Sequence, residues 1–356
     1  MPLTDLPLDQ LVDYRAAHGA PADFWSFWQE TLADARSADQ GVRATAVRDT
    51  LLSSVDVFDV RFPGWAGEPI AAWLIVPAGT TVPLPTVVSF AGYSSGRGLP
   101  TDHLLFPSAG LANLVVDSRG QGHDTPDRDP GRSTQWVEGF MTRGIDKPHH
   151  HYYRRLITDC ARAVDAARSL AQVDPDRIVV QGASQGGGLA LAVAGLTGDR
   201  IAGTICDVPF LCDFRRGADT ASAGPYVELV NFFRHHSPRQ VDRSFATLDY
   251  FDAVHFAARA TAPALFSVGL MDPTCPPSTV YGAFNSYAGD KHMETWRFGD
   301  HGGGYGASRP GHLAWLHHHD LLATSGRPRL EAGGVHHRAS GLPRSLRLGM
   351  RPGADG

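Results

Sequence analysis

One short segment has the pattern of a catalytic serine. Residues 182–186 read GASQG and match G-x-S-x-G. The segment lies between a predicted buried strand, 177–181, and a predicted apolar helix, 189–196. In that context the serine can occupy a sharp, strained turn that exposes its hydroxyl as a nucleophile, and its neighbours must be small. A glycine-rich turn with an incidental serine would share these letters, but the flanking strand and helix favour Ser184 as a nucleophile.

Two residues further along the chain could activate Ser184, because a serine hydroxyl is a weak nucleophile until a base takes its proton. Asp272 follows the predicted strand 264–269, and His301 follows the predicted strand ending at Phe298. Alone, Asp272 before a proline is an ordinary turn residue, and His301 beside glycines is an ordinary loop histidine. Serine, acid and histidine in this order instead predict a triad in which His301 is the base and Asp272 orients it.

Backbone amides are expected to bind the oxyanion that such a reaction forms. One belongs to Gln185, the residue after the nucleophile, and the other to the loop after an earlier strand. That loop begins Ala91-Gly92-Tyr93. We assign the second amide to Tyr93, since Gly92 gives the chain freedom to aim the next N–H. The alternative is that Tyr93 only forms a wall of the pocket.

The elements that must position these residues alternate along the chain. Two segments with period-two alternation, 55–62 and 71–76, predict a hairpin. Buried strands are predicted at 85–90, 111–117, 177–181, 201–208, 264–269 and 295–298, and helices at 8–37, 152–172, 189–196 and 313–322. Strands and helices in this order predict a mostly parallel sheet with helices on both faces. With the serine turn, this is the α/β-hydrolase fold.

Two segments depart from that alternation. Residues 209–255 are rich in aromatic side chains and predict a helical insertion that partly covers the site, with Phe210 among the side chains limiting the acyl group. From residue 325 the composition shifts to Arg, Gly, Pro and Ala without periodicity. We therefore predict a single domain over residues 1–324 and a disordered tail over residues 325–356.

Composition excludes several function classes. The 356 residues carry a net charge of -5, with 42% hydrophobic and 19% charged residues, which is a globular balance without the basic patch of a nucleic-acid-binding protein. No apolar segment is long enough to span a bilayer. The first residues lack the pattern of a signal peptide, and the four cysteines form no disulfide framework. A cytoplasmic enzyme without a membrane or nucleic-acid partner is expected.

Two runs of histidine, 149–151 and 317–319, raise the question of a metal. Zinc needs three or four ligands that converge in a tetrahedron. Neighbouring residues on a helix point in different directions, so the run 317–319 makes a poor chelate. We therefore expect no metal site at either run.

Several separated motifs together resemble those of one enzyme family. They are GASQGGG at 182–188, RGQG at 119–122, FAGYSSG at 90–96, GLMDPTCPPSTVYGAFN at 269–285, HYYRRLITDCARAVD at 151–165, VNFFRHHSP at 230–238 and the N-terminal PLTDLPLDQL…PADFWSFW. The chain resembles the cephalosporin C deacetylase and acetyl xylan esterase family, carbohydrate esterase family seven, over about residues 2 to 322.

The resemblance implies an esterase that removes acetyl groups from small acetylated sugars and from cephalosporin C without a cofactor. It supports Ser184, Asp272 and His301 as the triad, and Tyr93 and Gln185 as oxyanion donors. The family's RGQ motif falls on Arg119, Gly120 and Gln121, for which we favour a structural role in tying loops beneath the site. Members often form hexameric rings, so a homo-oligomer is expected, with a small acetylated molecule as the other partner.

Two departures and two rival functions remain. The family commonly has His-Glu at the base and His-Gly-Tyr in the oxyanion loop, where this chain has His301-Gly302 and Ala91-Gly92-Tyr93. Neither removes a triad atom, but both affect loop order or acyl preference. A short-chain esterase or an acyltransferase would share the fold and the triad, and a catalytically inactive binding protein would lack part of the triad.

Overall fold

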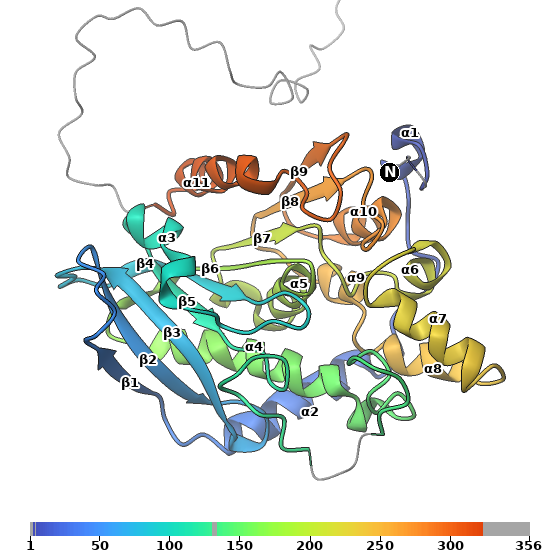
Figure 1. Ribbon diagram of the computed structural model, residues 1–356, viewed down its shortest axis with the longest axis horizontal. Helices are drawn as coiled ribbons and strands as arrows, with labels where there is room; N and C mark the ends of the chain where they lie inside the picture. The colour runs from blue at the N-terminus through green and yellow to red at the C-terminus, as the bar shows by residue number, and fades with distance from the viewer. Residues whose placement is uncertain (1–2, 4, 130–133, 323–356) are drawn as a thin grey trace, which may run out of the picture. The chain divides into compact units, whose positions relative to one another are not determined.

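A nine-stranded sheet forms the centre of the protein (Figure 1), with the strand order β1-β2-β3-β5-β4-β6-β7-β8-β9. The computed structural model describes Leu3, residues 5–129 and residues 134–322. The pairs β1–β2, β2–β3 and β3–β5 are antiparallel, and all later neighbours are parallel. The predicted hairpin and the mostly parallel sheet are therefore confirmed, while β1 was not predicted.

The bounds of the elements are as follows. The strands are β1 (Arg43–Val47), β2 (Val55–Pro63), β3 (Pro69–Pro77), β4 (Leu84–Phe90), β5 (Ala112–Val116), β6 (Val173–Ala183), β7 (Gly203–Asp207), β8 (Ala264–Gly269) and β9 (Lys291–Trp296). The helices are α1 (Leu8–Leu11), α2 (Phe24–Ser37), α3 (Leu105–Ser108), α4 (Tyr152–Ser169), α5 (Gln185–Thr197), α6 (Phe214–Thr220), α7 (Tyr226–His235), α8 (Val241–Leu248), α9 (Ala253–Ala257), α10 (Pro277–Ser286) and α11 (Ser308–His318).

Helices cover both faces of the sheet, as predicted (Figure 1). The larger core lies on one face, where α4 and α5 pack on the strands and α2 packs outside α4. A smaller core on the other face joins α3 and α11 to the strands through Phe106, Trp315 and Leu316. No helix among the described residues is long and apolar enough to cross a membrane.

The insertion between β7 and β8 is helical, as predicted for residues 209–255. It consists of α6, α7, α8 and α9. Its aromatic side chains join the larger core, where Phe214, Phe251 and Phe256 are fully buried. Helix α9 packs on α5, the helix that begins next to Ser184. The insertion is thereby attached to the element that carries the nucleophile.

Some element boundaries differ from the predictions. The predicted helix 8–37 is two helices, α1 and α2, because residues 12–23 are not helical. The last strand, β9, ends at Trp296, and Phe298 lies beyond it with 80% of its surface exposed. The predicted disordered tail, 325–356, lies outside the described residues, so it stays a prediction, as does the domain boundary at residue 324.

The guanidinium of Arg119 ties three parts of the fold together beneath the site. Its side chain has no exposed surface. It makes two hydrogen bonds, of 2.5 and 2.8 Å, to the carboxylate of Asp159 in α4, and a third of 2.7 Å to Glu68 before β3. Paired, forked hydrogen bonds of this kind match the planar geometry of a guanidinium and a carboxylate. Arg119 therefore joins the loop after β5 to α4 and to the β2–β3 hairpin.

Replacing this arginine is expected to destabilise the fold strongly. Arg119→Gln leaves Asp159 buried without its charged partner, which typically costs about 3–5 kcal/mol. Urea denaturation measures the change in the free energy of unfolding. Arg177→Gln is the matched control, because Arg177 pairs with Asp174 while the two side chains are 40% and 24% exposed, and exposed pairs contribute at most about 1 kcal/mol. Equal stability of the two variants would contradict the assignment.

Candidate active site

Ser184 lies at the junction of β6 and α5 in a strained backbone conformation. Its φ and ψ are 55° and -121°, a region that a residue with a side chain occupies only when its surroundings enforce it. A Cβ at Gly182 would lie 2.2 Å from the carbonyl carbon of Gly186, and one at Gly186 would lie 2.2 Å from the Phe90 oxygen. The glycines therefore allow the close approach that the turn requires.

The strained turn is fixed to the neighbouring strand by hydrogen bonds of the serine's own backbone. The Ser184 N–H donates to the carbonyl of Asp207 at the end of β7, at 2.9 Å. The Ser184 carbonyl accepts a bond of 2.9 Å from the N–H of Phe210. These bonds hold the serine above the carboxyl end of the sheet, where ligands bind in open α/β sheets.

Asp272 and His301 reach Ser184 from two other strand ends and form a hydrogen-bonded chain with it. The Nε2 atom of His301 lies 2.9 Å from Ser184 Oγ, and its Nδ1 atom lies 2.8 Å from Asp272 Oδ2. The side chain of Asp272 is fully buried, whereas that of His301 is 32% exposed. The histidine can thus contact both the serine and a molecule that enters from solvent. The structure brings together all three residues predicted as a triad.

The carboxylate of Asp272 is held in place by its own loop. Its second oxygen, Oδ1, accepts the backbone N–H groups of Thr274 and Cys275 at 2.8 and 2.9 Å. A carboxylate with both oxygens engaged cannot rotate freely, so it fixes the imidazole of His301. Sequence alone suggested a turn at Asp272. The structure shows that the backbone N–H groups of this turn bind the Asp272 carboxylate.

The two predicted oxyanion donors, Tyr93 and Gln185, belong to segments joined by a pair of glutamines. The side-chain amides of Gln121 and Gln185 hydrogen-bond to each other in both directions, at 2.9 and 3.1 Å. Gln121 Oε1 also accepts the N–H of Ser94 at 2.7 Å, and Gln185 Nε2 donates to the Gly92 carbonyl at 3.3 Å. The loop after β4, residues 91–94, is thereby attached to the start of α5. We name this segment the oxyanion loop after its predicted role.

The RGQ motif thus contributes two side chains that lie beneath the site. Gln121 holds the oxyanion loop and donates to the hydroxyl of Tyr152 at 2.9 Å, while Arg119 forms the buried ion pairs described above. Gly120 has a φ of 69°, which favours glycine. No atom of this motif is among those that line the pocket at Ser184, as the predicted structural role requires.

Phe210 differs from its prediction as a wall of the substrate pocket. Its side chain has no exposed surface, and it packs edge-on against Tyr226 with ring centroids 4.6 Å apart. A Cβ at Gly188 would lie 2.0 Å from the Phe210 oxygen, so α5 covers this residue closely. Phe210 is a core residue behind Tyr93, because the chain turns inward directly after β7.

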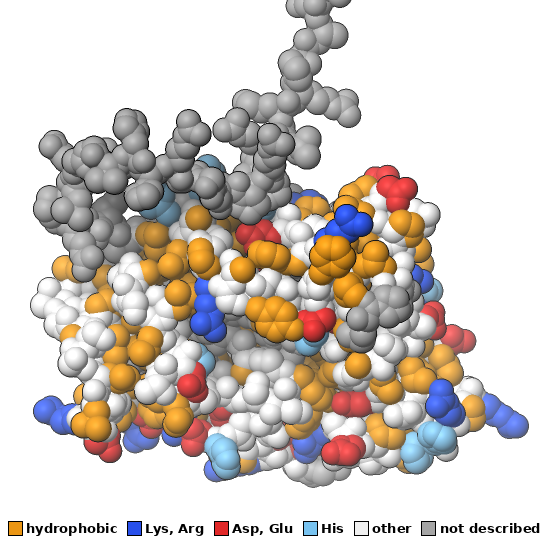
Figure 2. All heavy atoms as spheres, turned by 45° about the horizontal axis from the view of Figure 1, so that its top comes forward, with side chains coloured by type: hydrophobic (Ala, Val, Ile, Leu, Met, Phe, Trp, Pro, Cys, Tyr) orange, Lys and Arg blue, Asp and Glu red, His pale blue; other side chains and the backbone are white. Residues whose placement is uncertain are grey.

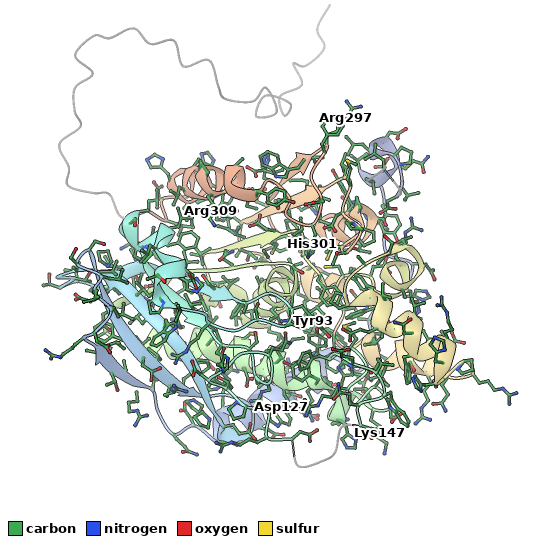
Figure 3. The ribbon with its side chains drawn as sticks, viewed as in Figure 1. Tyr93, Asp127, Lys147, Arg297, His301 and Arg309 are labelled. Carbon is green, nitrogen blue, oxygen red and sulfur yellow. The ribbon has the colours of Figure 1, made fainter. Side chains whose placement is uncertain are left out.

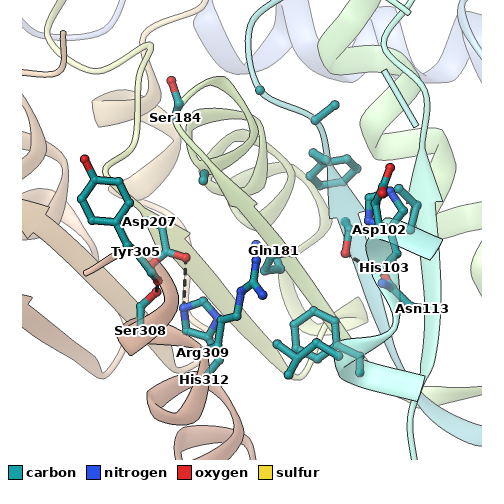
Figure 4. A pocket seen from close by; sticks show the side chains of 18 of the residues that line it. Asp102, His103, Asn113, Gln181, Ser184, Asp207, Tyr305, Ser308, Arg309 and His312 are labelled. Atoms are coloured by element: carbon teal, nitrogen blue, oxygen red, sulfur yellow. Dashed lines mark hydrogen bonds and ion pairs between the residues drawn. The ribbon is translucent and has the colours of Figure 1, made fainter. Parts of the chain in front are cut away.

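A large cavity opens at Ser184 and extends over the sheet face that carries α3 and α11 (Figure 4). Its volume is about 870 Å³, and its lining includes Ser184, His301, Tyr305 and Arg309. Figure 2 shows this region as a hollow in the middle of the face. None of the lining residues belongs to the insertion 209–255. The insertion instead contacts the site from behind the oxyanion loop, through Tyr93 (Figure 3).

The sheet face inside this cavity is polar, which the sequence analysis did not predict. The smaller core contains Val87, Val179, Ile205 and Leu265 in four neighbouring strands. Two positions later in each strand, on the same face, the cavity is lined by Ser89, Gln181, Asp207 and Ser267. Central parallel strands are normally apolar on both faces. This polar row, as we name the four residues, therefore points to a polar occupant.

One member of the polar row, Asp207, forms an ion pair with His312 of α11. Asp207 lies 3.0 Å from Nε2 of His312 and accepts a hydrogen bond of 2.7 Å from the Ser267 hydroxyl. Burial alone would lower the pKa of His312, but the hydrogen bond and charge of Asp207, with the charge of Glu294, raise its pKa overall. Figure 4 shows this pair at the base of the pocket, below Ser184 and beside Arg309.

Gly302, one of the two departures from the family pattern, has a local explanation. A Cβ at position 302 would lie 2.3 Å from the ring of Tyr305. The Tyr305 hydroxyl donates a hydrogen bond of 2.5 Å to Asp300, and the Gly302 N–H donates to the same carboxylate oxygen at 2.9 Å. Tyr305 and Gly302 together shape the loop that carries His301.

One group of side chains in the described part of the chain could hold a metal ion. It consists of Asp272, Cys275 and His301, whose donor atoms lie within 4.8 Å of one another. Two of these atoms already form the hydrogen bond between imidazole and carboxylate. Neither histidine run contributes to such a group within the described residues. The expectation that the protein needs no metal stays a prediction.

Comparison with known proteins identifies the family. A model of the acetyl xylan esterase family matches residues 1–319. The chain belongs to this family. Two solved acetyl xylan esterases are similar over their whole length: one from a Paenibacillus species, at 39% identity with a TM-score of 0.83, and one from a Thermoanaerobacterium species, at 32% identity with a TM-score of 0.82. They cover 89% and 90% of this chain.

More distant matches extend the likeness. An acetyl esterase of Xylanibacter ruminicola is 28% identical over 272 residues, which are 74% of this chain. The match spans 60% of the length of that relative. An acylaminoacyl peptidase of Pyrococcus horikoshii, at 17% identity and a TM-score of 0.54, shares the fold alone. The structure and the family together establish the predicted α/β-hydrolase fold.

Proposed function

We propose that this chain is a serine esterase that removes acetyl groups from small acetylated sugars, chiefly xylo-oligosaccharides, and from cephalosporin C. The observation that carries the proposal is the hydrogen-bonded chain from Ser184 through His301 to Asp272, with distances of 2.9 and 2.8 Å. Membership of the acetyl xylan esterase family and the acetyl esterase relatives support the choice of an acetyl ester.

The reaction proceeds through an acyl-enzyme. Ser184 Oγ attacks the acetyl carbonyl carbon while its proton passes to Nε2 of His301, and the amides of Tyr93 and Gln185 bind the oxyanion. The bond to the alcohol oxygen then breaks, and that oxygen takes the proton from His301. Water repeats the two steps on the acetyl-serine, which releases acetate and restores the serine. Asp272 holds the imidazole in the required tautomer and stabilises its cation.

The polar row indicates where the alcohol part of the substrate binds. Because His301 must deliver a proton to the leaving oxygen, the alcohol lies beside His301, and the cavity there is lined by Tyr305, Arg309 and the polar row. A volume of about 870 Å³ is within the range of sites that enclose a whole small molecule. Sugar hydroxyls can pair with these groups, so a polyhydroxylated alcohol fits the cavity.

A short-chain esterase or an acyltransferase of the same fold is the alternative, since either would use the same triad. Assembly into a homo-oligomer, in which hexameric rings are one form, and a cytoplasmic location are further proposals that rest on the family resemblance and on the sequence. Hydrolysis of cephalosporin C and acetylated xylose separates the first alternative from the proposed deacetylase, because a short-chain esterase with another natural substrate would cleave nitrophenyl acetate but neither of these.

Removing the nucleophile is expected to abolish ester hydrolysis without unfolding the protein. Loss of a triad member typically lowers kcat by a factor of about 10⁴ to 10⁶. Ser184→Ala should therefore lose activity on nitrophenyl acetate while its circular dichroism and thermal midpoint stay close to those of the unaltered protein. A serine-directed phosphonate should label Ser184. More than a few per cent residual activity in a folded variant would refute the role of Ser184.

The carboxylate that orients the base can be tested separately. Asp272→Asn keeps the size of the side chain but presents an amide to His301, which favours the wrong tautomer, so kcat is expected to fall by about 10⁴-fold. Steady-state kinetics on nitrophenyl acetate measure the loss. Asp300→Asn is the matched control, because Asp300 precedes His301 but hydrogen-bonds Tyr305 and Gly302 instead. An unchanged rate in Asp272→Asn would mean that another acid serves.

Acetyl esters should be cleaved faster than butyryl esters, and hexanoyl or longer esters hardly at all. Membership of the acetyl xylan esterase family and the acetyl esterase relatives support an acyl site limited to two carbons. A site that admitted longer chains would favour them, because each methylene bound in an apolar pocket contributes about 1 kcal/mol or more. The measurement is kcat/KM for nitrophenyl esters of two to eight carbons, beside cephalosporin C and acetylated xylose. An optimum at six or eight carbons would replace the deacetylase proposal with a general esterase.

A further inference from the structure

Glu228, from helix α7 of the insertion, contacts the oxyanion loop and belongs to no motif discussed above. Its Oε1 atom accepts a hydrogen bond of 2.7 Å from the Tyr93 hydroxyl, and its Oε2 atom accepts one of 3.1 Å from the Met141 N–H. The same tyrosine hydroxyl accepts the N–H of Phe140 at 2.6 Å. One carboxylate therefore joins α7, the loop after β4 and the segment around residue 140.

The chain around Glu228 is shaped to admit its carboxylate. Gly139 has a φ of 103°, and a Cβ there would lie 2.2 Å from the carboxylate atoms of Glu228. Only glycine leaves this space at such a backbone conformation. No basic side chain forms an ion pair with Glu228 within the described residues. Burying an ionised carboxylate without a positively charged partner lowers the stability of the folded protein. Packing alone therefore does not explain the position of Glu228.

We propose that Glu228 is a positioning residue of the reaction, which fixes Tyr93 so that the backbone N–H of that residue stays aimed at the oxyanion. The inference rests on the proposed function, because it requires that the Tyr93 amide bind the oxyanion. Glu228 itself touches neither the substrate nor the reacting atoms.

Tyr93 is held at both ends, and Glu228 supplies one of the two attachments. On the backbone side, Gln121 binds the N–H of Ser94, whose φ is 57°. On the side-chain side, the ring packs edge-on against Phe140 and Phe210, with centroids 5.6 and 6.1 Å away, and its hydroxyl meets Glu228. Without the second attachment the peptide before Tyr93 can rotate. Oxyanion donors act only when they are preorganised at hydrogen-bond distance, so such rotation lowers kcat.

The attachment depends on pH. Burial raises the pKa of Glu228 to about 6, against the lowering effect of the hydrogen bonds from Tyr93, Met141 and Phe140, and the charge of Glu138 raises it further. Tyr153 of α4 is another titratable group that interacts with Glu228. Above pH 6 the carboxylate is ionised and accepts both bonds. As the pH falls through about 6 it takes up a proton, one oxygen becomes a donor, and the attachment weakens.

The experiment compares Glu228→Gln with Glu138→Gln, which removes the same charge from an exposed neighbouring residue. In Glu228→Gln one carboxylate oxygen is replaced by an NH2 group that cannot accept, so only one of the two hydrogen bonds survives. The kcat for nitrophenyl acetate is expected to fall about 10- to 100-fold, with KM changed less than about 3-fold. Loss of a whole oxyanion donor costs about 10²–10³-fold. The inhibition constant of a trifluoromethyl ketone, which forms an oxyanion on the serine, should rise by the same factor. Well above pH 6, where Glu228 is ionised in either case, Glu138→Gln should keep the kcat and the inhibition constant of the unaltered protein.

The pH dependence of kcat/KM provides a second measurement, which would not change if Glu228 had only a structural role. The acid limb of kcat/KM should contain an ionisation near pH 6 from Glu228 in the unaltered protein, and this ionisation should be missing in Glu228→Gln. Tyr93→Phe removes the hydroxyl and keeps the ring, so it should give the same loss in kcat. The double variant should lose no more than either single one, because both remove the same contact.

The possible outcomes separate this inference from the proposed function. If Ser184→Ala is inactive while Glu228→Gln and Tyr93→Phe keep full kcat and inhibitor affinity, the positioning role is overturned and the esterase stands. If Ser184→Ala is active, the proposed function is overturned. If Glu228→Gln does not fold, Tyr93→Phe carries the test, and an additive loss in the double variant or an unaltered acid limb in a folded variant would also overturn the positioning role.

Discussion

The close approach of β6 and α5 at Ser184 is the constraint on which the rest of the site depends. The left-handed backbone of that residue persists only because Gly182 and Gly186 allow strand and helix to meet, and because Asp207 at the end of β7 binds its N–H and Phe210 beyond β7 binds its carbonyl. A serine placed this way has one face turned to the carboxyl ends of the strands. The acid, the base and the oxyanion loop all follow strand ends, so their convergence follows from the parallel order of the sheet.

Polar contacts beneath and behind the site hold the converging loops in fixed positions relative to the helices. The glutamine pair attaches the oxyanion loop to α5, Arg119 joins that region to α4 and the hairpin, and the Asp272 loop binds its own carboxylate. Each of these groups is costly to bury unless its partners are present. A displacement of one segment therefore breaks several paired contacts at once, and the fold resists such displacement.

The sequence predicts the triad well because its members stand next to recognisable strands in a fixed order. The parallel sheet follows from the periodicity of the chain, and the helical insertion from the aromatic-rich composition of residues 209–255. Glu228 could not be found this way, since it lies 135 residues from Tyr93 and outside the motif at 230–238 that its helix carries. Phe210 was placed wrongly because an aromatic residue next to a site can face inward or outward, and packing against α5 decides. Strand β1 is mostly exposed, so its alternation gave no buried stripe to detect.

The polar row shows how one sheet face can serve both stability and binding. Two residues along each strand separate Val179 from Gln181 and Leu265 from Ser267, so α11 covers the apolar positions and the cavity opens over the polar ones. Filling the row with apolar side chains would extend the core and gain stability by burial. It would also remove the partners that hydroxyl groups of a sugar need. Under the proposed mechanism the alcohol leaves beside His301, and the polarity of the cavity there favours a hydrophilic product over an alkyl one.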